Sequence, residues 1–318
     1  MTIVYTTFVQ VLIMFILTSL GYIITKAGVI NIATAKQLAG LLLKIVTPCV
    51  IISSFQMDGG SSMIRNLMIA FLLSFLTYFL AMAISAVLIR KKHSENFQIE
   101  RFAATYSNCG YMGLPLVKAV LGSISDDLGN LGVFYMSAFI VMLHLLSWTL
   151  GVSMITGGKT NKESVIKAIF SPGIIGIAIG LPLLLLSVRL PSFIGSPVEM
   201  IAKMNTPLAM IIIGAYMTET DIIGALKKIR PYFISFIRLI ICPVILIVIM
   251  FVFKVDFSLA LTATLAASAP SAALTTLFAT KFNKDISTAS ILVTISTLLS
   301  IITIPLMVAL MQFLFSFI

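Results

Sequence analysis

The chain has 318 residues, of which 59% are hydrophobic and only 10% are charged. Its mean hydropathy is +1.13, higher than the core of a soluble protein needs, and the apolar segments recur along the whole chain. This composition predicts an all-α polytopic membrane protein with no separate soluble domain. The formal net charge of +10 does not indicate nucleic-acid binding, because the basic residues lie in short loops between the apolar segments.

Ten membrane-spanning segments are predicted, each long enough to cross a hydrocarbon core that needs about 20 residues. They run near Tyr5–Thr25, Lys36–Phe55, Arg65–Ile89, Gln98–Leu121, Leu128–Ile155, Ser164–Ser187, Phe193–Met217, Pro231–Phe253, Phe257–Phe282 and Ile286–Phe315. Pro305 is expected to bend the long tenth segment. Most of the 21 basic residues lie in the loops that follow the odd-numbered spans. Because positive charge stays in the cytoplasm, both termini are expected to be extracytoplasmic, on the outer side of the cell membrane.

The middle of the fourth span contains the most informative stretch, Ser107-Asn108-Cys109-Gly110-Tyr111-Met112-Gly113-Leu114-Pro115. Its two glycines and its proline disfavour an unbroken helix. Backbone opens inside a bilayer only where it is buried in protein or lines a cavity, and such broken helices form the substrate sites of many secondary transporters. A kink packed through its glycines is the alternative. Asn108 counts against the kink, because an amide in hydrocarbon needs a partner.

The chain also repeats itself. Lys44–Pro48 in the second span matches Lys203–Pro207 in the seventh, half the chain length away. A repeat of five spans is odd in number, so the second copy must lie inverted in the membrane, an arrangement typical of transporters. The chain is therefore expected to be a single transporter domain with repeats of about 1–159 and 160–318. This match adds four residues to the candidate site: Thr47, Pro48, Thr206 and Pro207.

The repeat requires a second break in the ninth span, and Ala266–Thr276 supplies one around Pro270. Small residues let two backbones approach closely, and hydroxyl side chains can satisfy carbonyls that a proline frees. Two broken helices that cross present half-helix N-termini to the crossing point, which makes an anion site suited to a carboxylate. The candidate binding residues of the two breaks are Asn108, Cys109, Gly110, Tyr111, Gly113, Pro115, Ala269, Pro270, Ser271 and Thr275.

The stretch Asn108–Leu116 resembles the N-x-G-x-x-G-x-P signature of the auxin efflux carrier family. Bacterial members of that family include permeases ascribed to malate, malonate and other organic acids. Leu43–Pro48, Trp148–Gly151 and Ala269–Ser271 are similar to the same family. The long cytoplasmic loop typical of many plant members is absent.

The resemblance implies a fold similar to that of the bile acid:sodium symporters. It implies ten transmembrane helices in two inverted five-helix repeats, with broken crossover helices 4 and 9. It also implies a scaffold bundle, a transport bundle, and a substrate site at the crossover. In the family the Asn of the broken fourth helix lies at that site, which carries over to Asn108, and the prolines at the crossing carry over to Pro115 and Pro270.

Four other polar residues lie within the predicted spans. His144 is expected to touch the ligand, relay a proton, or remain neutral and hydrogen-bonded between helices; the sequence leaves these three open. Lys44, Lys203 and Arg238 are expected to snorkel towards the membrane surfaces. Asp126-Asp127 are expected to form a loop and the N-cap of the fifth span.

No carboxylate is expected deep in a span, which disfavours an exchanger built on buried acids and leaves coupling to Na⁺ or H⁺ open. No catalytic, nucleotide-binding or metal-ligand motif occurs, so neither an enzyme nor a cofactor is expected. The expected function is secondary transport, by alternating access, of a small organic anion, an auxin-like or malate-like mono- or dicarboxylate. A membrane-embedded ligand sensor or channel-like binding protein is the alternative. The expected partners are the substrate and the lipid bilayer, without nucleic acid; a homodimer is left open.

Overall fold

The computed structural model describes residues 2–56, 61–158, 166, 170 and 172–317, and the regular elements of this part are all helices. Seven of them are long and apolar enough to cross a membrane: Ile3–Lys26, Ile32–Ser54, Met63–Leu88, Asp126–Thr156, Ser192–Met217, Ile229–Val252 and Ile286–Phe315. Shorter apolar helices, Cys109–Gly122, Pro172–Leu185 and Phe257–Ser268, lie in the fourth, sixth and ninth predicted spans. The all-helical, polytopic class is thus confirmed. The start of the sixth predicted span lies outside the described residues.

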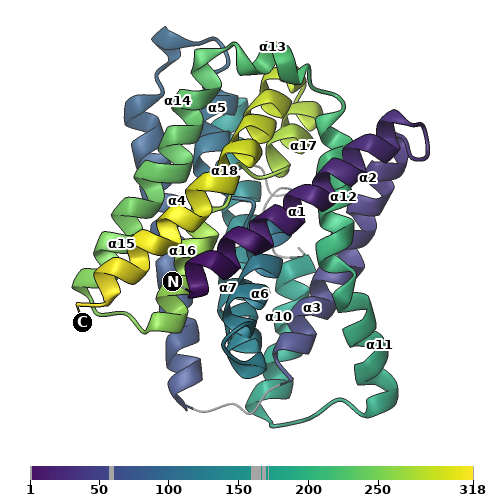
Figure 1. Cartoon of the computed structure of the whole chain (residues 1–318), viewed down its shortest axis with the longest axis vertical. Helices are drawn as coiled ribbons and strands as arrows, with labels where there is room; N and C mark the ends of the chain where they lie inside the picture. Colours follow the sequence, from purple (N-terminus) through teal and green to yellow (C-terminus); the bar gives the residue numbers. More distant parts are fainter. Residues whose placement is uncertain (1, 57–60, 159–165, 167–169, 171, 318) are drawn as a thin grey trace.

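Figure 1 shows the helices packed into one bundle. The first half of the chain forms α1 (Thr2–Lys26), α2 (Ile32–Leu41), η1 (Leu42–Val46), α3 (Thr47–Ser54), α4 (Ser61–Leu88), η2 (Lys91–His93), α5 (Phe97–Thr105), η3 (Cys109–Gly113), α6 (Leu114–Gly122), α7 (Asp126–Leu146), η4 (Ser147–Gly151) and α8 (Val152–Thr156). The second half forms α10 (Pro172–Leu185), α11 (Ser192–Lys203), α12 (Asn205–Met217), α13 (Ile222–Leu226), α14 (Ile229–Phe236), η5 (Ile237–Ile241), α15 (Cys242–Val252), α16 (Phe257–Ser268), α17 (Leu274–Lys281) and α18 (Ile286–Phe315).

Three of the helices contain a π-helical turn directly before a proline. The turns η1, η3 and η5 are followed by α-helices whose second residues are Pro48, Pro115 and Pro243. A proline within a helix has no N–H to donate and clashes with a carbonyl of the preceding turn. A π-turn widens the helix at that point and relieves the clash without ending the helix. At the first of these sites the Thr47 hydroxyl donates to the Leu42 carbonyl at 2.9 Å.

The helices pack in two groups. In the first group α1 lies against α12, and α3 lies against α10 and α11. The α1–α12 contact is backbone to backbone: a Cβ added to Gly214 would lie 1.9 Å from the Thr18 carbonyl oxygen. In the second group α7 packs on α4, α6 and α16, and α18 packs on α14, α16 and α17. The contact between α1 and α18 joins the two groups (Figure 1).

One local expectation needs correction. Ser125, not an aspartate, is the N-cap of α7, since its side chain accepts from the Leu128 N–H, and Asp126-Asp127 form the first turn. Negative side chains in the first turn of a helix interact favourably with the positive end of the helix dipole, so the two aspartates stabilise α7 without capping it. The α18 helix contains Pro305 within its length, and the bend expected there stays a prediction.

A polar layer at the upper end of the bundle in Figure 1 ties the start of α5 to α14 and α18. The buried Glu100 carboxylate, 2% exposed, accepts both Arg230 Nε and Arg230 Nη2, the latter at 2.7 Å. The Asn96 amide donates to the Asp285 carboxylate at 2.8 Å. These contacts hold the first half of the broken fourth span against the second half of the chain.

Replacing Glu100 with Gln is expected to lower the melting temperature of the purified protein by several degrees. The change leaves the Arg230 guanidinium without its charged partner, at a cost of about 1–3 kcal/mol once the partial exposure of Arg230 is allowed for. The measurement is thermal unfolding in detergent, with exposed Glu95→Gln as the matched control. Equal melting temperatures for the two variants would show that the pair does not stabilise the bundle.

Candidate functional site

The fourth and ninth predicted spans are both broken, and the two breaks touch. Helix α5 ends at Thr105 and η3 begins at Cys109, while α16 ends at Ser268 and α17 begins at Leu274. The intervening segments pair as a short antiparallel bridge. In this bridge the Asn108 N–H donates to the Pro270 carbonyl at 2.7 Å, and the Ala272 N–H donates to the Tyr106 carbonyl at 2.8 Å. The opened backbone groups therefore satisfy each other, as an apolar environment requires.

Arg238 holds the C-terminal ends of the two half-helices that lead into the breaks. Its side chain is fully buried, at 0% exposure. The guanidinium donates to the carbonyls of Ala267 at 2.7 Å, Ala269 at 3.2 Å and Thr105 at 3.4 Å. The expectation that Arg238 snorkels is wrong, because the freed carbonyls at the negative ends of α5 and α16 attract a cation more strongly than the membrane surface does.

A cavity of about 320 Å³, called the central cavity, lies between the two groups of helices. It is lined by Lys36, Ala39, Gly40, Leu43 and Thr47 of α2, η1 and α3, by Tyr216 of α12, by Asn108, Gly110 and Tyr111 of the first break, by Ile140, Leu143 and His144 of α7, and by Ala272, Ala273, Leu274 and Leu277 of the second break. Its wall is apolar apart from a few polar groups. The volume suits a small organic molecule.

The polar groups of the central cavity are placed to receive an anion. The N-terminal ends of η3 and α17 both border it, because Asn108, Gly110 and Leu274 line it. First-turn N–H groups have no partner within their own helix and carry the positive end of the helix dipole. The side-chain Nδ2 of Asn108 is buried and has no hydrogen-bond partner among the described residues. A ligand oxygen would supply the missing acceptor.

Comparison with known families identifies the chain. The family model described as membrane transport protein matches residues 6–165 and 158–308. The chain belongs to the membrane transport protein family. This is the auxin efflux carrier type that the fourth-span signature indicates, and its members are transporters rather than enzymes. A search of curated proteins returned no match.

Five of the predicted site residues of this transporter line the central cavity: Thr47, Asn108, Gly110, Tyr111 and His144. Others support the breaks from behind. Cys109 is buried with its Sγ 3.3 Å from the Tyr78 hydroxyl, and Gly113 packs against Met136. Ala269 and Pro270 contribute carbonyl acceptors, and the Ser271 N–H donates to Ser296 Oγ at 3.1 Å.

The remaining predicted residues lie away from the central cavity. Pro115 and Thr206 line a second cavity, between α3, α6, α7, α11 and α12. Pro48 is the second residue of α3 and is buried, and Pro207 is the third residue of α12 and is exposed. Thr275 is fully buried, with its hydroxyl unpaired among the described residues. The site predicted from sequence is therefore split between a cavity, its support and a second cavity.

The sequence did not predict the apolar residues of the cavity wall, nor four residues of the site with polar groups: Lys36, Tyr216, Arg238 and Ser296. Lys36, an exposed residue of α2, and Tyr216 of α12 both line the central cavity. Arg238 and Ser296 each bond to backbone groups of the ninth span. Hydrogen bonds to backbone groups leave no pattern in the sequence, so no signal marked Arg238 or Ser296. For Lys36 the available signal was its position at the start of a predicted span.

Proposed function

We propose that this membrane transport protein is a secondary transporter that moves a small organic anion across the cytoplasmic membrane. The observation that carries the proposal is the contact between two broken helices whose N-terminal ends border one cavity. In the proposed arrangement the seven long and three short apolar helices form ten spans in two inverted five-helix repeats. Helices 4 and 9 cross at the substrate site, which is how many transporters build a site at the membrane midplane.

The proposed mechanism is alternating access by movement of one helix group against the other. The group of α4–α8 and α14–α18 contains both breaks and would be the transport bundle, and the group of α1–α3 and α10–α12 would be the scaffold. The central cavity takes residues from both groups, so relative movement of the groups would open or close it. Close backbone packing between α1 and α12 favours a rigid scaffold.

The proposed orientation places both termini outside the cell. Both ends of the chain lie in the lower half of Figure 1, whereas α13, next to the basic Lys227-Lys228 pair, lies at the top. Because basic loops stay in the cytoplasm, the top is assigned to the cytoplasmic side. The central cavity, which reaches Lys36 at the start of α2, would then be on the cytoplasmic side of the crossing.

The lining of the central cavity favours a substrate with one carboxylate and an apolar body. Asn108, Lys36 and the half-helix N-termini provide donors for one anionic group. Leu143, Leu277 and Tyr111 are among the residues that cover the rest of the wall. A second carboxylate would find only the side chains of Thr47, Tyr111, His144 and Tyr216 as further polar partners in an otherwise apolar wall, at a cost of about 1–3 kcal/mol.

The proposal predicts uptake into proteoliposomes that contain the purified protein. Phenylacetate and malonate are matched probes, because each carries a CH₂-linked carboxylate but only malonate has a second one. We expect saturable uptake of both, with phenylacetate favoured about tenfold in kcat/KM. Imposed sodium and pH gradients would identify the coupling ion. Absence of uptake for both anions, with the protein shown to be folded, would favour the alternative of a membrane-embedded ligand sensor.

A further inference from the structure

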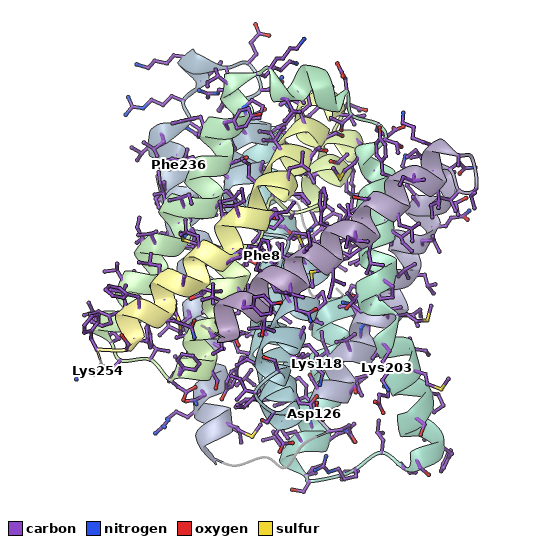
Figure 2. All side chains as sticks on the ribbon, viewed as in Figure 1. Phe8, Lys118, Asp126, Lys203, Phe236 and Lys254 are labelled. Carbon is purple, nitrogen blue, oxygen red and sulfur yellow. The ribbon has the colours of Figure 1, made fainter. Side chains whose placement is uncertain are left out.

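A second cavity, called the lower cavity, lies at the opposite end of the interface between the two helix groups. Its volume is about 270 Å³, and its lining includes Lys118, Asn130, Glu199, Lys203, Asn205 and Thr206. Figure 2 shows Lys118 and Lys203 in the lower half of the bundle, away from the crossing. The lower cavity is therefore more polar than the central cavity and is separate from it.

The lower cavity continues the interface that contains the central cavity. Along α7, Leu143 lines the central cavity and Val133 the lower one. Along α12, Tyr216 lines the central cavity and Thr206 the lower one. Ten residues of helix, about 15 Å at 1.5 Å per residue, separate the members of each of these pairs. On α3 the two cavities come closer, since Thr47 lines the central cavity and Val50 the lower one. Between them Met136 packs on Gly113, with its Cε 3.3 Å from the position that a Cβ would take on Gly113.

Asn205 shows that the lower cavity lacks a partner for a buried group. Its side chain is 3% exposed, and neither its Oδ1 nor its Nδ2 has a hydrogen-bond partner among the described residues. An unpaired amide in a membrane-embedded bundle is costly, since hydrocarbon supplies no hydrogen-bond partner for it. Asn108 in the central cavity has the same unpaired Nδ2. Each cavity thus contains one buried Asn amide that is available to a ligand.

The charges of the lower cavity favour an anion. The Lys203 ammonium pairs with Glu199 at 2.8 Å, while the Lys118 ammonium donates to the neutral Asn130 carbonyl oxygen. Lys118 lies within electrostatic range of Asp126 and Glu199 as well as of Lys203. The lining therefore carries two ammonium groups and one carboxylate, with a single excess positive charge. A carboxylate bound between Lys118 and the Asn205 amide would match both the charge and the missing acceptor.

We propose that the lower cavity is a second carboxylate-binding site, formed by Lys118, Lys203 and Asn205, at the other mouth of the transport pathway. Binding at this site follows from the residues of the cavity alone. Its role as the waiting position for substrate on the side opposite the central cavity rests on the proposed function. A cation-lined mouth would raise the local concentration of an anionic substrate before the helix groups move.

The test uses a reporter cysteine, Thr206→Cys, in a Cys49→Ser background; the other two cysteines, Cys109 and Cys242, are buried. The purified protein in a neutral detergent at low ionic strength is reacted with a sulfonate-bearing and a trimethylammonium-bearing methanethiosulfonate. Their rate ratio is normalised to the ratio for a free thiol. We expect a normalised preference for the anionic reagent, and Lys118→Gln should lower it about sevenfold. One charge roughly 7 Å away in water changes the rate of each reagent about threefold, in opposite directions for the two reagents. Lys44→Gln, an exposed lysine outside both cavities, is the matched control and should leave the ratio unchanged.

A ligand-protection experiment then tests the Asn205 amide. Phenylacetate at millimolar concentration should slow modification of the reporter cysteine, and Asn205→Ala should remove this protection while Asn108→Ala retains it. A normalised rate ratio of one that Lys118→Gln does not change would overturn the second site. Loss of protection in Asn108→Ala but not in Asn205→Ala would overturn it as well. Protection without uptake in proteoliposomes would refute the proposed transport function and leave the second site standing.

Discussion

Replacing Arg238 with Met is expected to abolish transport and to lower the melting temperature of the purified protein by about 10 °C. The guanidinium is fully buried and donates to three carbonyls at the ends of α5 and α16. Hydrogen bonds from a charged donor contribute about 1.5–3 kcal/mol each, and the methionine would leave three buried acceptors unpaired. Without the guanidinium the two breaks lose the group that joins them.

Two further variants separate the roles of Arg238. Arg238→Lys retains the charge but replaces a planar fork by a single ammonium group that cannot reach three carbonyls at once, so an intermediate melting temperature is expected. Arg65→Met, which removes an exposed arginine, should change little. Thermal unfolding and uptake at wild-type levels in Arg238→Met would show that the breaks are held by their own backbone bridge alone.

Replacing Asn108 with Asp is expected to reduce anion uptake by at least about a hundredfold. The substitution keeps the size of the side chain, but it exchanges an unpaired N–H donor for a negative charge at the wall of the central cavity. Asn108→Ala removes the donor without adding charge, and the loss of one hydrogen bond to a carboxylate predicts a reduction of about tenfold to a hundredfold. The order of the two variants therefore reports the charge of the substrate.

The measurement is initial-rate uptake of phenylacetate, with the melting temperature as the control for folding. Equal rates for Asn108→Ala and Asn108→Asp would mean that the anionic group of the substrate binds elsewhere. Wild-type rates for both variants would remove Asn108 from the site. Since the Asn108 backbone N–H, not its side chain, bonds Pro270, neither change should open the bridge between the breaks.

The positions of both breaks were predictable because glycine and proline act through the backbone of their own segment. Gly110, Gly113 and Pro115 disfavour a continuous fourth helix, and Pro270 does the same in the ninth. The contact between the breaks followed from the repeat, which pairs spans that are distant in sequence. The π-turns before Pro48, Pro115 and Pro243 were not predicted, since a proline in an apolar run is compatible with a kink, an end or a widened turn.

The partners of buried charges were not predictable from the sequence. Arg238 lies near the start of an apolar run, where an arginine normally extends to the membrane surface. Its acceptors are carbonyls 29 to 133 residues away in the chain. Glu100 is the third residue of the fourth predicted span, and its carboxylate is buried against Arg230, 130 residues away in the chain. Only the tertiary fold brings such groups together.

The repeat predicted Thr47 and Thr206 as equivalent residues of one site, whereas Thr47 lines the central cavity and Thr206 the lower one. An inverted relation between the two copies would produce this outcome, because equivalent positions then face opposite ends of the same interface. The sequence match predicted that the two threonines occupy equivalent positions, but it did not predict how deep each residue lies in the membrane.

Counterflow in proteoliposomes tests the central claim, alternating access at the crossing of the two breaks, most directly. Vesicles loaded with unlabelled phenylacetate are diluted into a trace of labelled phenylacetate without any ion gradient. The account predicts a transient accumulation of label above equilibrium for the wild type, and its loss in Asn108→Asp. A carrier that must reorient with its substrate shows this overshoot, whereas a channel does not. Saturable flux without overshoot in the wild type, or overshoot unchanged in Asn108→Asp, would contradict the account.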